Sequence, residues 1–128
     1  MKTVFYLSTC STCKRILSEV SLPKEVEKRD IKYDPITPGE LLQLRELAGS
    51  YDAIFSKKAR NYIHYKDQEL SESLMESLLL SDYTFLKRPI ICYDDFISIG
   101  NQKDRVEALK IRFINLFGSY HFFFVSKY

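Results

Sequence analysis

Residues 4–15 read VFYLSTCSTCKR and place a Cys-x-x-Cys motif, Cys10 and Cys13, directly after a short apolar run. Residues 4–7 have the composition of a buried strand, and the apolar residues from 16 to 20 recur with the spacing of a helix face. We therefore expect the two cysteines to lie where a strand ends and a helix begins. Two thiols held within one turn of backbone are typical of a redox-active pair.

The start of a helix favours the ionised form of a cysteine. The first N–H groups of a helix have no partner within it, and the helix dipole places partial positive charge there. A free cysteine has a pKa of about 8.5, which can fall to about 3.5–7.5 at such a position. Lys14 and Arg15 strengthen this effect if their side chains turn toward the thiols, and not if they point into solvent. The motif therefore predicts a reactive thiolate.

Length and composition indicate one soluble globular domain. The chain has 128 residues, of which 45% are hydrophobic and 28% charged, so it can bury an ordinary core. Its net charge of +2 is too small to predict direct binding to nucleic acid. The apolar run at 4–7 is too short for a signal peptide, and three cysteines do not make a disulfide framework. We therefore expect a cytoplasmic protein with no membrane span.

The segment after the motif helix predicts a second strand and a capped helix. Residues 26–31 form a strand-like stretch that ends before a turn. Thr37 can cap a helix in which Pro38 takes the first position and Glu40 completes a capping box. Gly49 follows the last apolar residue, where a left-handed residue commonly ends a helix.

In the rest of the chain, stretches typical of helices and of strands follow one another, which completes an α/β pattern. A basic segment at 55–62 precedes a helix opened by Ser71. Two β-rich runs, 89–93 and 96–99, then have the pattern of a hairpin, and a helix is expected over about 103–110. The pattern predicts a block of helices between two groups of strands.

Five segments carry a resemblance to a known family: 6–15, Asp30-Ile31, 55–62, Leu86-Lys87-Arg88-Pro89-Ile90-Ile91 and Ile99-Gly100. They resemble the arsenate reductase (ArsC)/Spx family over about residues 2–110. The resemblance implies a thioredoxin-like fold, a mixed sheet flanked by helices, with a helical insertion between a β-α-β unit and a C-terminal hairpin. It further implies that Pro89 is cis beside the active cysteine and that Arg88 faces the same site. The domain would comprise 1–112, with 113–128 as an extension.

The order of the two cysteines predicts their chemical roles. Cys10 would project beyond the helix and attack a disulfide or a reducible oxyanion, and Cys13 would displace the product as an internal disulfide. Glutathione or a redoxin would then supply electrons, with no bound cofactor. A zinc site needs about four ligands, and only Cys92, His64 and His121 remain, so no metal is expected. Cys92, in an apolar strand, is expected to be a core residue.

Departures from the family pattern bear on the substrate. Arsenate reductases of this type hold the oxyanion with several arginines, of which only Arg88 is matched here. Ser56 stands where one of the others would be, and the stretch Asn101-Gln102-Lys103 stands where another would be. A basic set at 57–60 either substitutes as an anion clamp or forms a solvated face. Arsenate is therefore a candidate substrate and not the favoured one. The residues expected to bind substrate are Ser11, Thr12, Lys14, Lys57, Lys58, Arg60 and Pro89.

Residues 113–128 concentrate seven aromatic residues and lie beyond the resemblance. A membrane span needs about 20 apolar residues, and this segment is too short and too polar. It could add a strand to the sheet, cover an apolar face, or have no selected role. We favour packing on the domain or on a second copy, which would make a homodimer.

Two functions follow from the motif and the resemblance. The first is a cytoplasmic thiol–disulfide oxidoreductase with Cys10, Cys13 and Arg88 as catalytic residues, acting on a small disulfide or oxyanion. The second is a Spx-like regulator that binds RNA polymerase and uses the cysteine pair only as a sensor. The motif is common to both.

Overall fold

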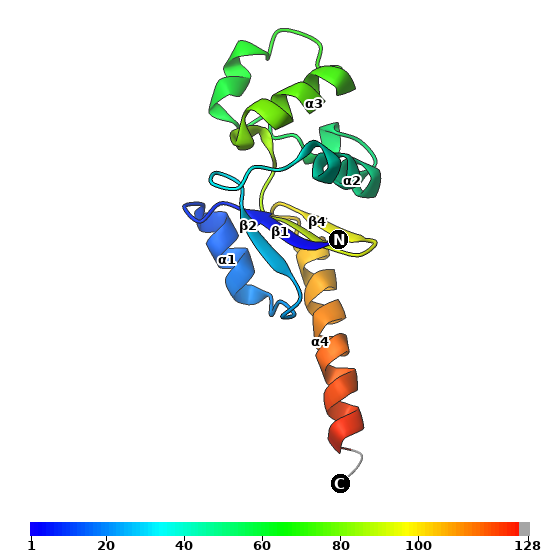
Figure 1. The fold of residues 1–128 in the computed structure, drawn as a ribbon. Coiled ribbons are helices and arrows are strands. Elements are labelled where there is room, and N and C mark those ends of the chain that lie inside the picture. Colours follow the sequence, from blue (N-terminus) through cyan, green and yellow to red (C-terminus); the bar gives the residue numbers. More distant parts are fainter. Residues whose placement is uncertain (126–128) are drawn as a thin grey trace.

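The computed structural model describes the backbone of residues 1–125 and the side chains of residues 1–114. Its centre is a four-stranded sheet in the order β2-β1-β3-β4 (Figure 1). The pair β1–β2 is parallel, and the pairs β1–β3 and β3–β4 are antiparallel. The strands are β1 (Lys2–Tyr6), β2 (Glu27–Asp30), β3 (Ile90–Tyr93) and β4 (Phe96–Ile99).

Helices cover both faces of this mixed sheet. Between β2 and β3 the chain leaves the sheet and builds the block of α2, α3 and short 3-10 turns, seen at the top of Figure 1. The predicted order, a β-α-β unit, a helical insertion and a hairpin, is therefore confirmed. The elements are α1 (Ser11–Glu19), α2 (Pro38–Ala48), η1 (Asp52–Ile54), η2 (Arg60–His64), α3 (Glu72–Ser81), η3 (Tyr83–Phe85) and α4 (Lys103–Val125).

Two apolar cores form because side chains alternate between the faces of a strand. In β1, Phe5 packs into a core shared with the helical block, and Val4 packs into a core shared with α1 and α4. Cys92 is fully buried on the side of the helical block, as expected for a core residue. The sheet is therefore covered on both sides.

The start and end of α2 follow the local rules predicted from the sequence. The Thr37 hydroxyl accepts a hydrogen bond from the Glu40 N–H at 3.2 Å, and the Glu40 carboxylate accepts one from the Thr37 N–H at 3.0 Å. Pro38 is the first helical residue. Gly49 ends the helix with a φ of 95°, in the left-handed region that glycine enters without a steric penalty.

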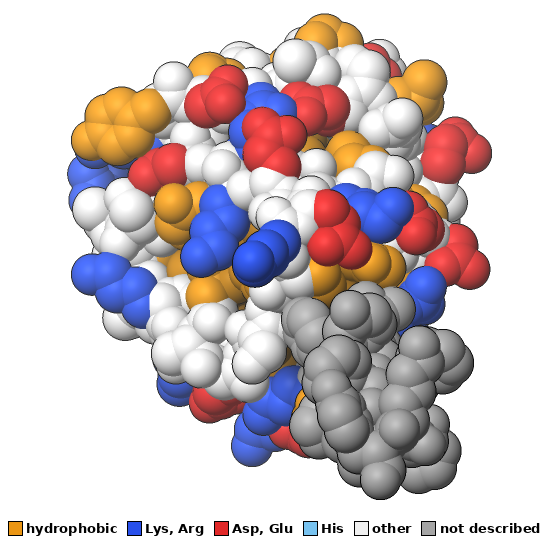
Figure 2. Space-filling view, turned by 60° about the horizontal axis from the view of Figure 1, so that its bottom comes forward, with side chains coloured by type: hydrophobic (Ala, Val, Ile, Leu, Met, Phe, Trp, Pro, Cys, Tyr) orange, Lys and Arg blue, Asp and Glu red, His pale blue; other side chains and the backbone are white. Residues whose placement is uncertain are grey.

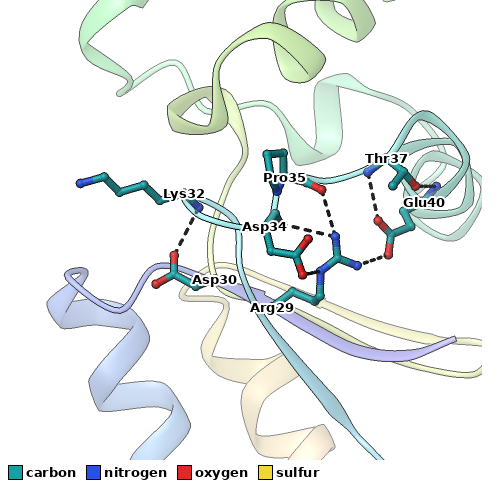
Figure 3. Close-up of polar contacts among 7 residues, drawn as sticks. All are labelled: Arg29, Asp30, Lys32, Asp34, Pro35, Thr37 and Glu40. Atoms are coloured by element: carbon teal, nitrogen blue, oxygen red, sulfur yellow. Dashed lines mark hydrogen bonds and ion pairs between the residues drawn. The ribbon is translucent and has the colours of Figure 1, made fainter.

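Arg29 joins β2 to the start of α2 (Figure 3). Its guanidinium lies 2.7 Å from the Asp34 carboxylate, pairs with Glu40, and donates to the Pro35 carbonyl oxygen at 2.9 Å. Only 8% of Arg29 is exposed, so these partners replace water around a buried charge. The network fixes where the helical block leaves the sheet.

The last helix is longer than predicted. We expected a helix to about residue 110, and α4 continues to Val125 with Val106, Leu109 and Phe113 buried against the sheet. The alternative of an added strand is wrong for 113–125, because that backbone is helical. The packing of side chains beyond residue 114, and with it the predicted homodimer contact, lies outside the described side chains. Within the described part of the chain, no helix combines the length and apolarity that a membrane crossing requires.

Candidate active site

Cys10 and Cys13 lie at the junction of β1 and α1, as the sequence predicts. Cys10 is the N-cap residue of α1, and its carbonyl oxygen accepts the Lys14 N–H at 3.1 Å. The Cys10 N–H donates to the Leu7 carbonyl oxygen at 3.1 Å, which fixes the turn between strand and helix. Cys13 lies in the first turn and is fully buried, whereas Cys10 is half-buried. Only Cys10 is therefore open to an incoming substrate.

The surroundings of Cys10 favour its thiolate. Partial burial opposes the charge, but the N–H and thiol of Cys13, the N–H of Thr12 and the positive charge of Arg88 together hold the pKa of Cys10 below its ordinary value. The neutral Cys10 side chain makes no capping hydrogen bond within the usual distance limits. The helix start therefore stabilises the thiolate through its unpaired N–H groups and its dipole.

The other two thiols are held in the neutral form. Burial raises the pKa of Cys13 to about 11, and the adjacent Cys10 sulfur adds to this effect. Burial alone raises the pKa of Cys92 to about 12. The motif thus pairs one accessible, acidic thiol with one buried, weakly acidic thiol.

An open cleft of about 740 Å³ lies beside Cys10. Of the predicted site residues, Thr12, Lys57, Lys58 and Arg88 line it together with Cys10, whereas five others do not: Ser11, Cys13, Lys14, Arg60 and Pro89. The bond between Arg88 and Pro89 is cis, as the resemblance implied. The complete lining is Cys10, Thr12, Asp52, Phe55, Ser56, Lys57, Lys58, Leu86, Lys87, Arg88, Ile99, Gly100, Asn101 and Gln102.

Lys87 and Asp52 were missed as site residues. Lys87 precedes Arg88 in a segment without helix or strand periodicity, so its side-chain direction could not be inferred from spacing. Asp52 lies in η1, and its carboxylate is 4.0 Å from the Lys57 ammonium. The adjacency of Lys87 to Arg88 was the available signal.

Arg88 is held by the backbone of the turn that precedes it. Its Nη1 donates to the carbonyl oxygens of Thr84 and Leu86, each at 3.1 Å. The Asp82 carboxylate fixes that turn by accepting the Thr84 hydroxyl at 2.6 Å and the Asn61 amide at 2.7 Å. Among the described residues, Arg88 pairs with no carboxylate, and its buried Nε has no hydrogen-bond partner. Its positive charge is therefore available to the cleft.

The helical insertion carries one wall of the cleft. The Ser56 N–H donates to the Phe85 carbonyl oxygen at 2.6 Å, and the Lys87 N–H donates to that of Ile54 at 2.9 Å. The rings of Phe55 and Phe85 stack with centroids 5.0 Å apart. These contacts join the two segments that supply the basic side chains.

Arg15 connects the motif helix to the opposite wall. It donates to the Asn101 side-chain oxygen at 2.9 Å and lies 3.5 Å from the Glu19 carboxylate. Lys14 is exposed and does not line the cleft.

Within the described residues, no three His, Cys, Asp or Glu side chains are placed to hold a metal ion.

We expect Cys10 to be alkylated at a lower pH than the other cysteines. In wild-type protein, the pH midpoint for iodoacetamide labelling of Cys10 should lie below the ordinary thiol value, because its thiolate is stabilised. Arg88→Met should raise that midpoint by removing one stabilising charge. Labelling across pH with mass mapping of each cysteine checks both; earlier labelling of Cys13, or an unmoved midpoint in Arg88→Met, would contradict the description.

The chain is similar to known proteins over most of its length. The ArsC family profile matches residues 5–109. No curated protein sequence matches the chain. An ArsC family-related protein from Bacteroides fragilis is 24% identical with a TM-score of 0.68, covering 86% of this chain and 100% of its own.

Two further structures extend the comparison. A Staphylococcus aureus protein solved by NMR is 26% identical with a TM-score of 0.65, covering 84% of this chain and 97% of its own. An arsenate reductase from Vibrio cholerae is 16% identical with a TM-score of 0.67, covering 84% and 98%. The likeness confirms the predicted thioredoxin-like fold with its helical insertion. Because the profile spans most of the sequence, the chain belongs to the ArsC family.

Proposed function

We propose that this ArsC-family protein is a thiol–disulfide oxidoreductase in which Cys10 attacks the substrate and Cys13 resolves the intermediate. One observation supports this division: the accessible thiol has the lowered pKa, and the buried thiol one helical turn away has a pKa of about 11. An attacking thiol must be ionised and reachable. A resolving thiol must stay neutral until the intermediate forms beside it.

The reaction balances in four thiol–disulfide exchanges. The Cys10 thiolate attacks one sulfur of a disulfide, forms a mixed disulfide with that half, and releases the other half as a thiolate. Cys13 loses its proton and attacks the Cys10 sulfur, forming the Cys10–Cys13 disulfide and releasing the second half. A first donor thiol then attacks the Cys10–Cys13 disulfide and forms a mixed disulfide. A second donor thiol displaces it, so that both cysteines are thiols again and the donor leaves as a disulfide.

Arg88 has a supporting role in this proposal. Its positive charge stabilises the Cys10 thiolate before attack and lies in the cleft where a leaving thiolate develops. Glutathione or a redoxin, glutaredoxin or thioredoxin, is the proposed donor. Arsenate remains a lesser candidate, because Ser56 and Asn101 line the cleft where the family pattern expects further arginines.

Turnover with a supplied donor tests the proposal. We expect wild-type protein to reduce bis(hydroxyethyl) disulfide with glutathione and glutaredoxin, or with a thioredoxin system, and Cys10→Ser to lose at least about 10³-fold in rate. Arsenate is the second substrate in the same assay. Formation of a Cys10–Cys13 disulfide without turnover by any donor would contradict the enzyme and favour a redox sensor such as the Spx-like regulator.

A further inference from the structure

Positive charge in this chain is concentrated at the cleft beside Cys10. The lining contains four basic side chains, Lys57, Lys58, Lys87 and Arg88, against the single carboxylate of Asp52, a net charge of +3. The whole chain carries +2, so the remainder carries −1. On the face seen in Figure 2, basic and acidic side chains are interspersed. The charge at the cleft is therefore local and not a property of the whole surface.

Most of this charge is not neutralised within the protein. Among the described residues, Lys58, Lys87 and Arg88 have no carboxylate within 4.0 Å, and Lys57 has only Asp52, at 4.0 Å. A positive cleft with low-dielectric walls attracts anions and raises their rate of encounter by about 10- to 10³-fold. The cleft is thus built to favour a negatively charged reactant.

The size and lining of the cleft point to more than a bare oxyanion. Its volume of about 740 Å³ is in the range of sites for whole organic ligands, about 300–1,000 Å³. An ion of four oxygens would occupy the space of only a few water molecules, about 30 Å³ each. Phe55, Leu86 and Ile99 add apolar surface, and Asn101 and Gln102 add amides. These groups suit an organic ligand that has both apolar parts and negatively charged groups.

We infer that the substrate is a small, peptide-sized disulfide bearing carboxylates, and that Lys57, Lys58 and Lys87 determine this specificity. The inference rests on the proposed function, since it concerns which disulfide Cys10 attacks. Lysine suits this role because its ammonium is a point charge on a flexible stem and can meet carboxylates at differing positions. Arg88 stabilises the Cys10 thiolate, and the three lysines bind the carboxylates of the substrate.

The test compares disulfides that differ in charge. Three probes serve: dithiodipropionate with two carboxylates, uncharged bis(hydroxyethyl) disulfide, and cystamine with two ammonium groups. Rate constants for their reaction with reduced protein are divided by those for a small free thiol, which removes intrinsic reactivity. We expect the normalised rate for the dianion to exceed that for the uncharged disulfide by at least about 10-fold, with cystamine slowest. Raising salt from about 0.01 M to about 1 M, which shortens the Debye length from about 30 Å to about 3 Å, should remove most of this preference.

The variant Lys57→Gln/Lys58→Gln/Lys87→Gln assigns the effect to these residues. We expect the ratio of dianion to uncharged rate to fall by about 10-fold or more, whatever happens to the two rates individually. Lys66→Gln is the matched control, because Lys66 is exposed and does not line the cleft; its ratio should match wild type. An unchanged ratio in the triple variant, or no charge preference in wild type, would overturn this inference alone. Failure of wild-type Cys10 to react with every disulfide would instead overturn the proposed function.

Discussion

Cys13→Ser is expected to release one thiol per protein molecule from a symmetric disulfide, where wild-type protein releases two. Without donor, attack by Cys10 liberates the first half of the substrate, and only Cys13 can liberate the second. The variant should therefore retain one half as a mixed disulfide on Cys10. Cys10→Ser should slow release of the first thiol by at least about 10³-fold. The thiol released per protein is quantified after the reaction is quenched. Intact-protein mass measurement then identifies the adduct on Cys10.

Two further variants make that result specific. Cys13→Ala should behave like Cys13→Ser, which separates loss of the thiol from the effect of a buried hydroxyl. Cys92→Ala should still release two thiols, because Cys92 is a buried strand residue with a pKa of about 12 and does not line the cleft. Release of two thiols by Cys13→Ser would show that another group resolves the intermediate and would contradict the assigned role of Cys13.

Arg29→Met is expected to lower the free energy of unfolding by about 3 kcal/mol, because it removes one partner of a buried charge network. Glu40 then loses its cation, and the carbonyl oxygen of Pro35 loses a donor (Figure 3). Arg45→Met, in α2, is the control. Arg45 pairs with Glu46 and Glu72 at the surface, so its loss should cost at most about 1 kcal/mol. Urea unfolding of the three proteins measures the difference; equal losses for both variants would contradict the importance of the Arg29 network.

The same network predicts how stability depends on pH. Partial burial opposes the Glu40 carboxylate, but the Thr37 N–H and the Arg29 guanidinium stabilise it and lower its pKa. A lowered pKa in the folded state means that this stabilisation is fully present above the unfolded value, about 4.3, and is lost as pH falls below it. Wild type and Glu40→Gln should therefore differ in stability at neutral pH and converge in acid.

Features set by local hydrogen bonding could be predicted from the sequence. Thr37 and Glu40 satisfy N–H groups three residues apart, so the cap of α2 could be predicted from residues 37–40 alone. The motif cysteines were placed correctly for the same reason, since a strand end and a helix start are both local signals. The wall of the cleft was less predictable: Arg60 was expected there and does not line it, whereas Lys87 does.

Tertiary contacts explain these differences. Arg60 begins the short turn η2, none of whose residues line the cleft, while the Lys87 N–H donates a hydrogen bond to the Ile54 carbonyl oxygen. Helix or strand periodicity in the sequence indicates neither the position of Arg60 nor that of Lys87. The length of α4 was underestimated because the aromatic residues after 112 reduce helix propensity only slightly and carry no stop signal before Gly118.

The central claim is that Cys10 and Cys13 form one redox unit, and mass mapping of wild-type protein tests it most directly. Reduced protein is treated with one equivalent of bis(hydroxyethyl) disulfide, quenched in acid, digested and mapped. We predict that the protein loses the mass of two hydrogens, with Cys10 linked to Cys13 and Cys92 free. A persistent adduct on Cys10 beside a free Cys13, or a disulfide that includes Cys92, would contradict the claim.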